Sequence, residues 1–399
     1  MSTKTFEIHI HDDQLTRLRQ KLALSDFPIG AQVDDSWNRG PPVAEIKRLV
    51  QVWHDSYDWR KAEARLNAFP QFTTSIDVDE FGSYEVHHIH KKSSASNAVP
   101  LLFLHGWPGS FIEVTKVLDD LVEGQSGGTA FHVVAPSLID FGFSSPSKKE
   151  SFQFEQHAEA YHKLMLNLGY TQYVIQAGDV GSLVARFIAM RYGPFHCKAY
   201  HTNTPVPAEP KQESHPEVYS KILETPLTEA EKIALQRLAH FSQEGNGYYK
   251  QQTTKPLTIG YALKDSPVAL LAWLYEKMHD WTDNYPWSDD EILTWVSIYY
   301  FSTPGPDASS NVYYAMEHHD PPAFAASQVY IKVPFGVARF HNDLVMLPKL
   351  WNHTLGPFVF DSEHERGGHF AAWERPDVIV KDLLEMFHGG GAAYGFGEK

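Results

Sequence analysis

The sequence has a single cysteine, no long apolar run and few positive charges, and each shortage excludes a class of protein. Cys197 has no partner for a disulfide within the chain, so a reducing compartment is expected and a disulfide-rich secreted fold is excluded. No segment approaches the about 18 consecutive apolar residues of a membrane span. With 34 basic against 49 acidic side chains, the formal net charge of −15 argues against nucleic acids and anionic membranes as partners.

The N-terminal segment "MSTKTFEIHIHDDQ" is polar and lacks the apolar run of a signal peptide. We therefore expect a soluble, cytoplasmic protein without a membrane anchor. The length of 399 residues and the hydrophobic fraction of 43% allow a large buried core. The sequence leaves a monomer and a homodimer open.

Strands alternate with helices in two parts of the chain, which predicts an α/β fold with a mostly parallel sheet flanked by helices. Runs such as "VPLLFL" and "YVIQA" alternate with helical patterns in residues 81–204, and the same rhythm returns in residues 326–399. Residues 205–325 are mainly helical and are expected to form a lid over the C-terminal edge of the sheet, where ligands of such sheets bind. Residues 1–80 are mixed, with a strand-like "TFEIHI" before a helical pattern.

The segment "YVIQAGDVGSLVARFIAMRYG", residues 173–193, has the pattern of a strand, a tight turn and a helix. In many hydrolases this corner has the pattern G-x-S-x-G and holds a nucleophilic serine at its tip. Here the tip residue is Asp179, and the small residues Gly178 and Gly181 permit the sharp, strained turn. The alternative role for Asp179 is to cap the following helix.

A second motif, "LLFLHGWPGS", ends an early strand in a His-Gly-x-Pro turn. Hydrolases of this architecture take one oxyanion-hole amide from such a turn and the second from the residue after the nucleophile. These amides would belong to Trp107 and Val180. The Trp107–Pro108 bond is a candidate for a cis peptide, and an ordinary tight turn is the alternative reading.

A histidine near the C-terminus completes a candidate triad. His369 follows two glycines after a late strand, in agreement with the chain order of nucleophile, acid and histidine. Asp343, in "ARFHNDL" after the preceding strand, is the expected carboxylate partner. Asp361, Glu363 and Glu365 are rivals on the histidine's own loop.

An aspartate nucleophile implies chemistry that differs from that of serine. Its carboxylate is ionised at neutral pH and attacks without a base, so the product is an alkyl ester. The histidine then activates the water that hydrolyses this ester. Haloalkanes and epoxides both offer the required sp³ carbon with a leaving group, but an epoxide oxygen also needs an acid. Tyrosine pairs at 248–249 and 313–314 in the helical segment are candidates for that acid.

The motifs together resemble those of epoxide hydrolases of the microsomal type, a branch of the α/β-hydrolase fold that includes juvenile hormone epoxide hydrolases and soluble fungal members. The resemblance spans nearly the whole chain. It includes "YDWRKAEARLNAFPQFT", "LLFLHGWPGSF", "QAGDVGS", "TTKPLTIGYALKDSPVALLAWLYEK", "PFGVARFHNDL" and "GGHFAAWERP". It implies that residues 1–80 form a meander wrapped around the core and a lid.

The resemblance also implies roles for single residues. The family's nucleophile, acid and base fall on Asp179, Asp343 and His369. The ring-opening tyrosines fall on Tyr248 and Tyr314, with Tyr313 as the alternative to Tyr314. At the second tyrosine the family usually has a basic residue next, whereas this chain has Ala315.

The expected function is therefore hydrolysis of a small apolar epoxide by water, without a cofactor. A haloalkane dehalogenase-like hydrolase and a non-catalytic, ligand-binding member of the fold are the alternatives. Histidine clusters at 87–90 and 317–320 suggest no third ligand with metal-binding spacing, so no metal is expected.

Overall fold

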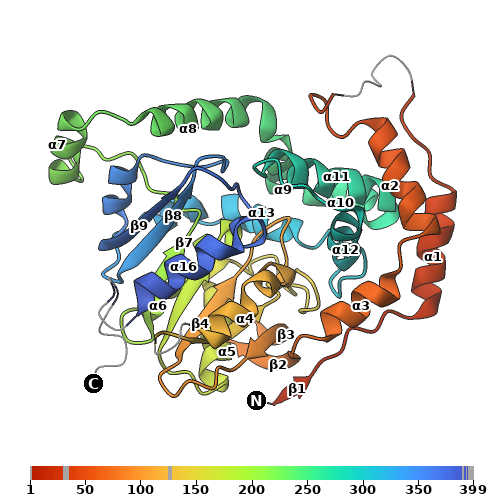
Figure 1. Ribbon diagram of the computed structural model, residues 1–399, viewed down its shortest axis with the longest axis horizontal. Helices are drawn as coiled ribbons and strands as arrows, with labels where there is room; N and C mark the ends of the chain where they lie inside the picture. Colours follow the sequence, from red (N-terminus) through yellow and green to blue (C-terminus); the bar gives the residue numbers. More distant parts are fainter. Residues whose placement is uncertain (1, 30–35, 125–127, 389–390, 392, 394–399) are drawn as a thin grey trace.

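The computed structural model describes residues 2–29, 36–124, 128–388, 391 and 393, and these form one mixed sheet of nine strands (Figure 1). The strand order is β1-β2-β3-β5-β4-β6-β7-β8-β9, parallel from β5 to β9 and antiparallel from β1 to β5. The strands are β1 Thr3–Thr5, β2 Gln71–Val78, β3 Gly82–Lys91, β4 Val99–Leu104, β5 Phe131–Pro136, β6 Tyr173–Ala177, β7 Cys197–Thr202, β8 Phe335–Phe340 and β9 Phe358–His364. The expected α/β fold with a mostly parallel sheet is confirmed.

Helices cover the parallel part of the sheet, which is why its central strands are largely buried. All five residues of β6 are buried, as expected for a strand with packed layers on both faces. Helix α5 packs against α6, and α16 against α4, with α16 in front of the sheet in Figure 1. These helices are α4 Leu118–Glu123, α5 Phe154–Asn167, α6 Asp179–Tyr192 and α16 Pro376–Phe387, and the short α15 spans Ala371–Glu374.

The segment between β7 and β8 is helical and is called the helical insertion below. It lies along the edge of the sheet at the top of Figure 1, where the green α8 and the teal helices are seen. Its helices are α7 Pro216–Glu224, α8 Glu229–His240, α9 Gly247–Thr254, α10 Pro256–Asp265, α11 Pro267–Asp280, α12 Asp289–Tyr300, α13 Ser310–Glu317 and α14 Ala323–Ser327, with a π-helical turn at Phe241–Gly245.

The N-terminal segment packs against the helical insertion as well as the sheet. Helices α1 Asp12–Ala23, α2 Val43–Asp55 and α3 Trp59–Asn67 contact α11 and α12, and they lie beside the teal helices in Figure 1. An ion pair of 2.6 Å joins Arg48 to Asp289 across this boundary. The segment therefore contacts both the sheet and the helical insertion.

The prediction of a strand at "TFEIHI", residues 5–10, is wrong beyond its first residue, because β1 spans Thr3–Thr5. Beyond it, the amides of Ile8 and Ile10 donate to the side chains of Asn67 and Glu63 at 2.8 and 2.7 Å. Side chains of α3 thus take the place of a neighbouring strand. None of the helices in the described ranges is long and apolar enough to cross a membrane.

Candidate active site

Asp179 lies at the corner between β6 and α6, in a backbone conformation that L-residues seldom adopt. Its φ is +47°, and its amide donates to Thr204 Oγ1 at 3.1 Å. Gly178 occupies the N-cap position and Asp179 is the first residue of α6, so the carboxylate is not the cap of this helix. A Cβ at Gly181 would lie 2.5 Å from the carbonyl oxygen of Leu104, which explains the need for glycine in this turn.

The turn after β4 presents a backbone donor to this carboxylate. The Trp107 amide donates to Asp179 Oδ1 at 2.8 Å, and the Trp107–Pro108 peptide is cis, as expected. A Cβ at Gly106 would lie 2.2 Å from the same oxygen. The Val180 amide belongs to the first turn of α6, where amides have no partner within the helix.

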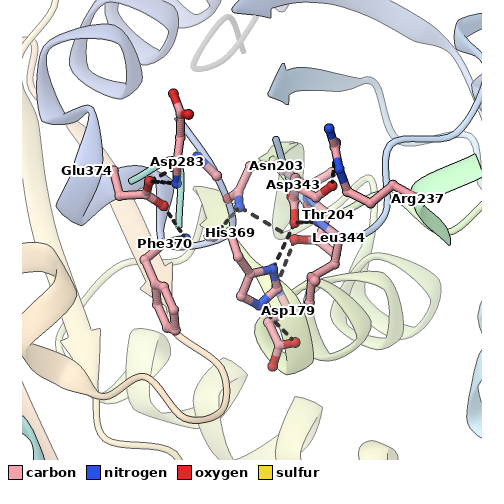
Figure 2. A network of polar contacts seen from close by, with 12 residues as sticks. Asp179, Asn203, Thr204, Arg237, Asp283, Asp343, Leu344, His369, Phe370 and Glu374 are labelled. Carbon is pink, nitrogen blue, oxygen red and sulfur yellow. Dashed lines mark hydrogen bonds and ion pairs between the residues drawn. The ribbon is translucent and has the colours of Figure 1, made fainter. Parts of the chain in front are cut away.

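His369 stands between two carboxylates (Figure 2). Its Nδ1 is 2.9 Å from Asp343 Oδ1, and its Nε2 is 3.3 Å from Asp179 Oδ2. Burial acts to lower the pKa of His369, but the charges of Asp343 and Asp179 outweigh it and raise the pKa well above its usual range. The position between the two carboxylates therefore favours the protonated form of the imidazole.

The structure also distinguishes Asp343 from the other acidic residues that the sequence offers as partners of His369. Asp361 and Glu363 pair with Arg339 at 2.8 and 2.6 Å, and Glu365 is exposed. Asp343 is 2% exposed and lies after β8, next to the loop that carries His369. Asp179, Trp107, Asp343 and His369 thus all follow parallel strands, at the edge where ligands bind in such sheets.

Two tyrosines of the helical insertion face this site, and one of them is not the residue expected. Tyr248 is 8% exposed and its ring stacks on that of Trp107, with centroids 5.0 Å apart. Tyr313 is 3% exposed, its ring lies 5.6 Å from that of Trp107, and its hydroxyl interacts with that of Tyr248. Burial is the main cause that raises the pKa of both phenols well above the usual value.

The expected Tyr314 points elsewhere. Its ring stacks on His318 with centroids 3.7 Å apart, and it lines a separate surface cavity beside Lys255. Successive side chains of a helix point about 100° apart, so only one residue of the 313–314 pair faces the site. That residue is Tyr313. In the other pair, the Tyr249 hydroxyl donates to Glu317, which leaves Tyr248 toward Trp107.

A glutamate that the sequence analysis did not single out anchors the histidine loop. The Glu374 carboxylate accepts hydrogen bonds from three backbone amides, those of Asp283 at 2.8 Å, Gly368 at 3.1 Å and Phe370 at 3.1 Å (Figure 2). Burial raises the pKa of Glu374 to about 7. Because Asp283 belongs to the helical insertion and the other two residues flank His369, Glu374 links the His369 loop to the insertion.

Within the described ranges, no group of three His, Cys, Asp or Glu side chains is placed to hold a metal ion. His87, in the first histidine cluster, is buried and contacts Ser137 and Gln71 at 2.8 and 2.9 Å. The arrangement can perform nucleophilic attack by a carboxylate, followed by attack of an activated water.

Two family models match the chain. The model described as "Epoxide hydrolase N terminus" matches residues 3–114, and the model for the alpha/beta hydrolase fold matches residues 99–257. A putative epoxide hydrolase of Stigmatella aurantiaca is 36% identical over 392 residues, which cover 96% of this chain and 84% of the relative. Epoxide hydrolase 1 of Sus scrofa is 30% identical, with 96% of this chain and 88% of the relative covered.

Solved structures agree with these relatives. The epoxide hydrolase of Aspergillus niger is similar with a TM-score of 0.82 and 35% identity, over 96% of this chain and 95% of that chain. The juvenile hormone epoxide hydrolase of the silkworm Bombyx mori has a TM-score of 0.86 and 26% identity, over 96% of this chain and 93% of that chain.

Changing Asp343 to Asn should lower the pKa of His369, because it removes one of the two charges that hold the imidazole protonated. An NMR titration of the imidazole nitrogens measures this. Glu365→Gln on the same loop is the matched control and should leave the titration unchanged. If the pKa of His369 is the same in the Asp343→Asn protein, Asp343 does not act on the imidazole and the assignment is wrong.

Proposed function

The chain belongs to the epoxide hydrolase family, and we propose that it converts small apolar epoxides to vicinal diols through a covalent ester on Asp179. One observation carries this proposal. The carboxylate of Asp179 is held between a backbone amide of the turn after β4 and the imidazole of His369, with Asp343 behind that imidazole. A nucleophile, an oxyanion donor and a base are thus within reach of one another.

In the first step, an Asp179 oxygen attacks a ring carbon of the epoxide. The C–O bond of the ring breaks, and the ring oxygen leaves as an alkoxide that needs a proton. Tyr248 and Tyr313 supply this proton, because their raised pKa keeps both phenols protonated and an alkoxide is far more basic than a phenolate. The product of this step is a hydroxyalkyl ester of Asp179.

In the second step, water attacks the ester at Cγ of Asp179. His369 Nε2 takes a proton from that water, and the carbonyl oxygen of the ester becomes an oxyanion. The amide of Trp107 stabilises this oxyanion, a contribution of about 3–4 kcal/mol for one such donor, and the Val180 amide is the second donor. The bond between Cγ and the alkyl oxygen then breaks. The proton on His369 passes to the departing oxygen, which completes the diol, and the proton left on the Asp179 carboxyl group then passes to the imidazole and restores the starting pair.

Ester formation itself prepares His369 for its role as a base. Before the reaction, the charges of Asp179 and Asp343 together keep the imidazole protonated. Esterification neutralises Asp179, so one of the two charges is lost and the pKa of His369 falls. The neutral imidazole that a general base requires is therefore favoured after alkylation.

The tyrosines separate this reaction from the haloalkane alternative. A halide leaves as a stable anion and needs no proton, so two buried phenols beside the nucleophile would serve no purpose there. The non-catalytic alternative has equally little support, because it gives no reason for a charged triad at the ligand edge of the sheet.

His369→Gln should form the ester but fail to hydrolyse it, because the imidazole acts in the second step. Turnover of styrene oxide should fall by about 10²–10⁴-fold, the usual contribution of a general base. Intact-mass spectrometry should show the protein heavier by one epoxide. The double variant Asp179→Asn/His369→Gln is the matched control and should stay unmodified. An unmodified His369→Gln protein would contradict the ester route.

Changing Tyr248 and Tyr313 together to Phe should abolish ester formation, because no acid would then protonate the ring oxygen. Tyr314→Phe, one position along the same helix, is the matched control and should alkylate at the wild-type rate. Rapid-quench mass spectrometry with styrene oxide follows this step directly. Loss of alkylation in the Tyr314 variant, with retention in the double variant, would assign the acid to the other face of α13.

A further inference from the structure

Glu113 is a buried carboxyl group beside the triad that the reaction described above does not use. It lies on the 3₁₀ helix η1 Phe111–Lys116, which directly follows the turn that carries the Trp107 amide. Together with Asp179 and His369 it lines a small cavity. Burying a carboxyl group without a hydrogen-bond partner costs free energy, so a buried glutamate at this place indicates a function.

The two oxygens of the Glu113 carboxyl group differ in their surroundings. The Ser110 amide acts on the carboxyl group to lower its pKa, whereas Oε1 is buried without a hydrogen-bond partner in the described part of the chain. A Cβ at Gly109 would lie 1.8 Å from Oε1, so this oxygen lies directly over the glycine of the turn. A buried, unpaired acceptor is destabilising unless another molecule satisfies it.

The cavity has the size and polarity for that molecule. About 20 Å³ is open to the centre of a water molecule, which is room for roughly one water. Gln176 and Asn203 also line it, but these two side chains hydrogen-bond each other at 3.2 Å. Glu113 Oε1 is therefore the acceptor left over beside Asp179 and His369.

We propose that Glu113 orients the hydrolytic water: Oε1 accepts one of its protons while His369 Nε2 takes the other. A water whose two hydrogens point at these acceptors directs a lone pair at the third neighbour, Cγ of the Asp179 ester. The O–H bond toward His369 breaks as the new bond to Cγ forms, and the hydrogen bond to Glu113 stays intact. This inference rests on the ester mechanism of the proposed function.

The charge of Glu113 suits this role. Burial is the main cause that raises its pKa to about 8, and the neighbouring Asp179 acts in the same direction. At neutral pH the group is largely neutral, with an acceptor lone pair on Oε1 when its proton lies on Oε2. A second anion beside the Asp179 nucleophile is thereby avoided.

Glu113→Gln tests the proposal because it replaces one carboxyl oxygen, a hydrogen-bond acceptor, with an NH₂ group, which is a donor. A glutamine that keeps its oxygen toward the Ser110 amide turns its NH₂ group toward the cavity, where the water then meets a donor instead of an acceptor. Ester hydrolysis should slow by about 10–100-fold, the effect of one misplaced hydrogen bond, while alkylation continues at the wild-type rate. The ester should therefore accumulate during turnover of styrene oxide.

Rapid-quench intact-mass spectrometry measures both rates in the same reaction. Glu159→Gln is the matched control. Glu159 lies on α5, is only 6% exposed, and accepts hydrogen bonds from Lys163 and from the backbone amide of Asp79. It does not line the cavity, so the rates of alkylation and ester hydrolysis should both stay unchanged. Wild-type hydrolysis in the Glu113→Gln protein would overturn the proposal and leave the ester mechanism intact. An unmodified His369→Gln protein would instead reject the ester mechanism itself.

A second variant guards against a simple folding defect. Glu113→Ala removes the acceptor without introducing a donor, and it too should slow hydrolysis selectively. Thermal unfolding shows which of the two variants is folded, and each folded one should accumulate ester. If neither folds, Glu113 is a structural residue and the proposal is wrong.

Discussion

The site depends on one constraint: the carboxylate of Asp179 is fixed in place before any substrate binds. A left-handed backbone angle turns its side chain out of the corner between β6 and α6. The Trp107 amide holds one oxygen and the His369 imidazole lies beside the other. In the proposed mechanism both groups also serve the later water attack, so neither has to move between the two steps.

The helical insertion holds both neighbours of that carboxylate. On one side, the Trp295 indole and the Tyr299 hydroxyl donate to the carbonyl oxygens of Pro108 and Gly109, in the turn that presents the Trp107 amide. On the other side, the His369 amide donates to the Trp281 carbonyl at 2.8 Å, and Glu374 ties the same loop to the insertion. The insertion thus does more than carry the tyrosines, since it positions the Trp107 amide and the His369 imidazole.

Local patterns were enough to predict the corner at Asp179, the turn at Trp107 and the pairing of His369 with Asp343, because each follows a strand at a known edge. Orientation on a helix was not predictable for Tyr313 and Tyr314, since the two side chains point about 100° apart and the local pattern does not fix how the helix is rotated about its axis. Glu113 escaped notice because its burial depends on tertiary packing, which a lone glutamate in a sequence does not reveal.

The ester on Asp179 is the central claim, and a single turnover in ¹⁸O-labelled water tests it most directly. With enzyme in excess over styrene oxide, the first diol should contain an unlabelled oxygen from Asp179, and the label should appear in the Asp179 carboxylate. Labelled diol should form only in later turnovers. If the first diol already carries the label, water attacks the epoxide directly and the account is contradicted.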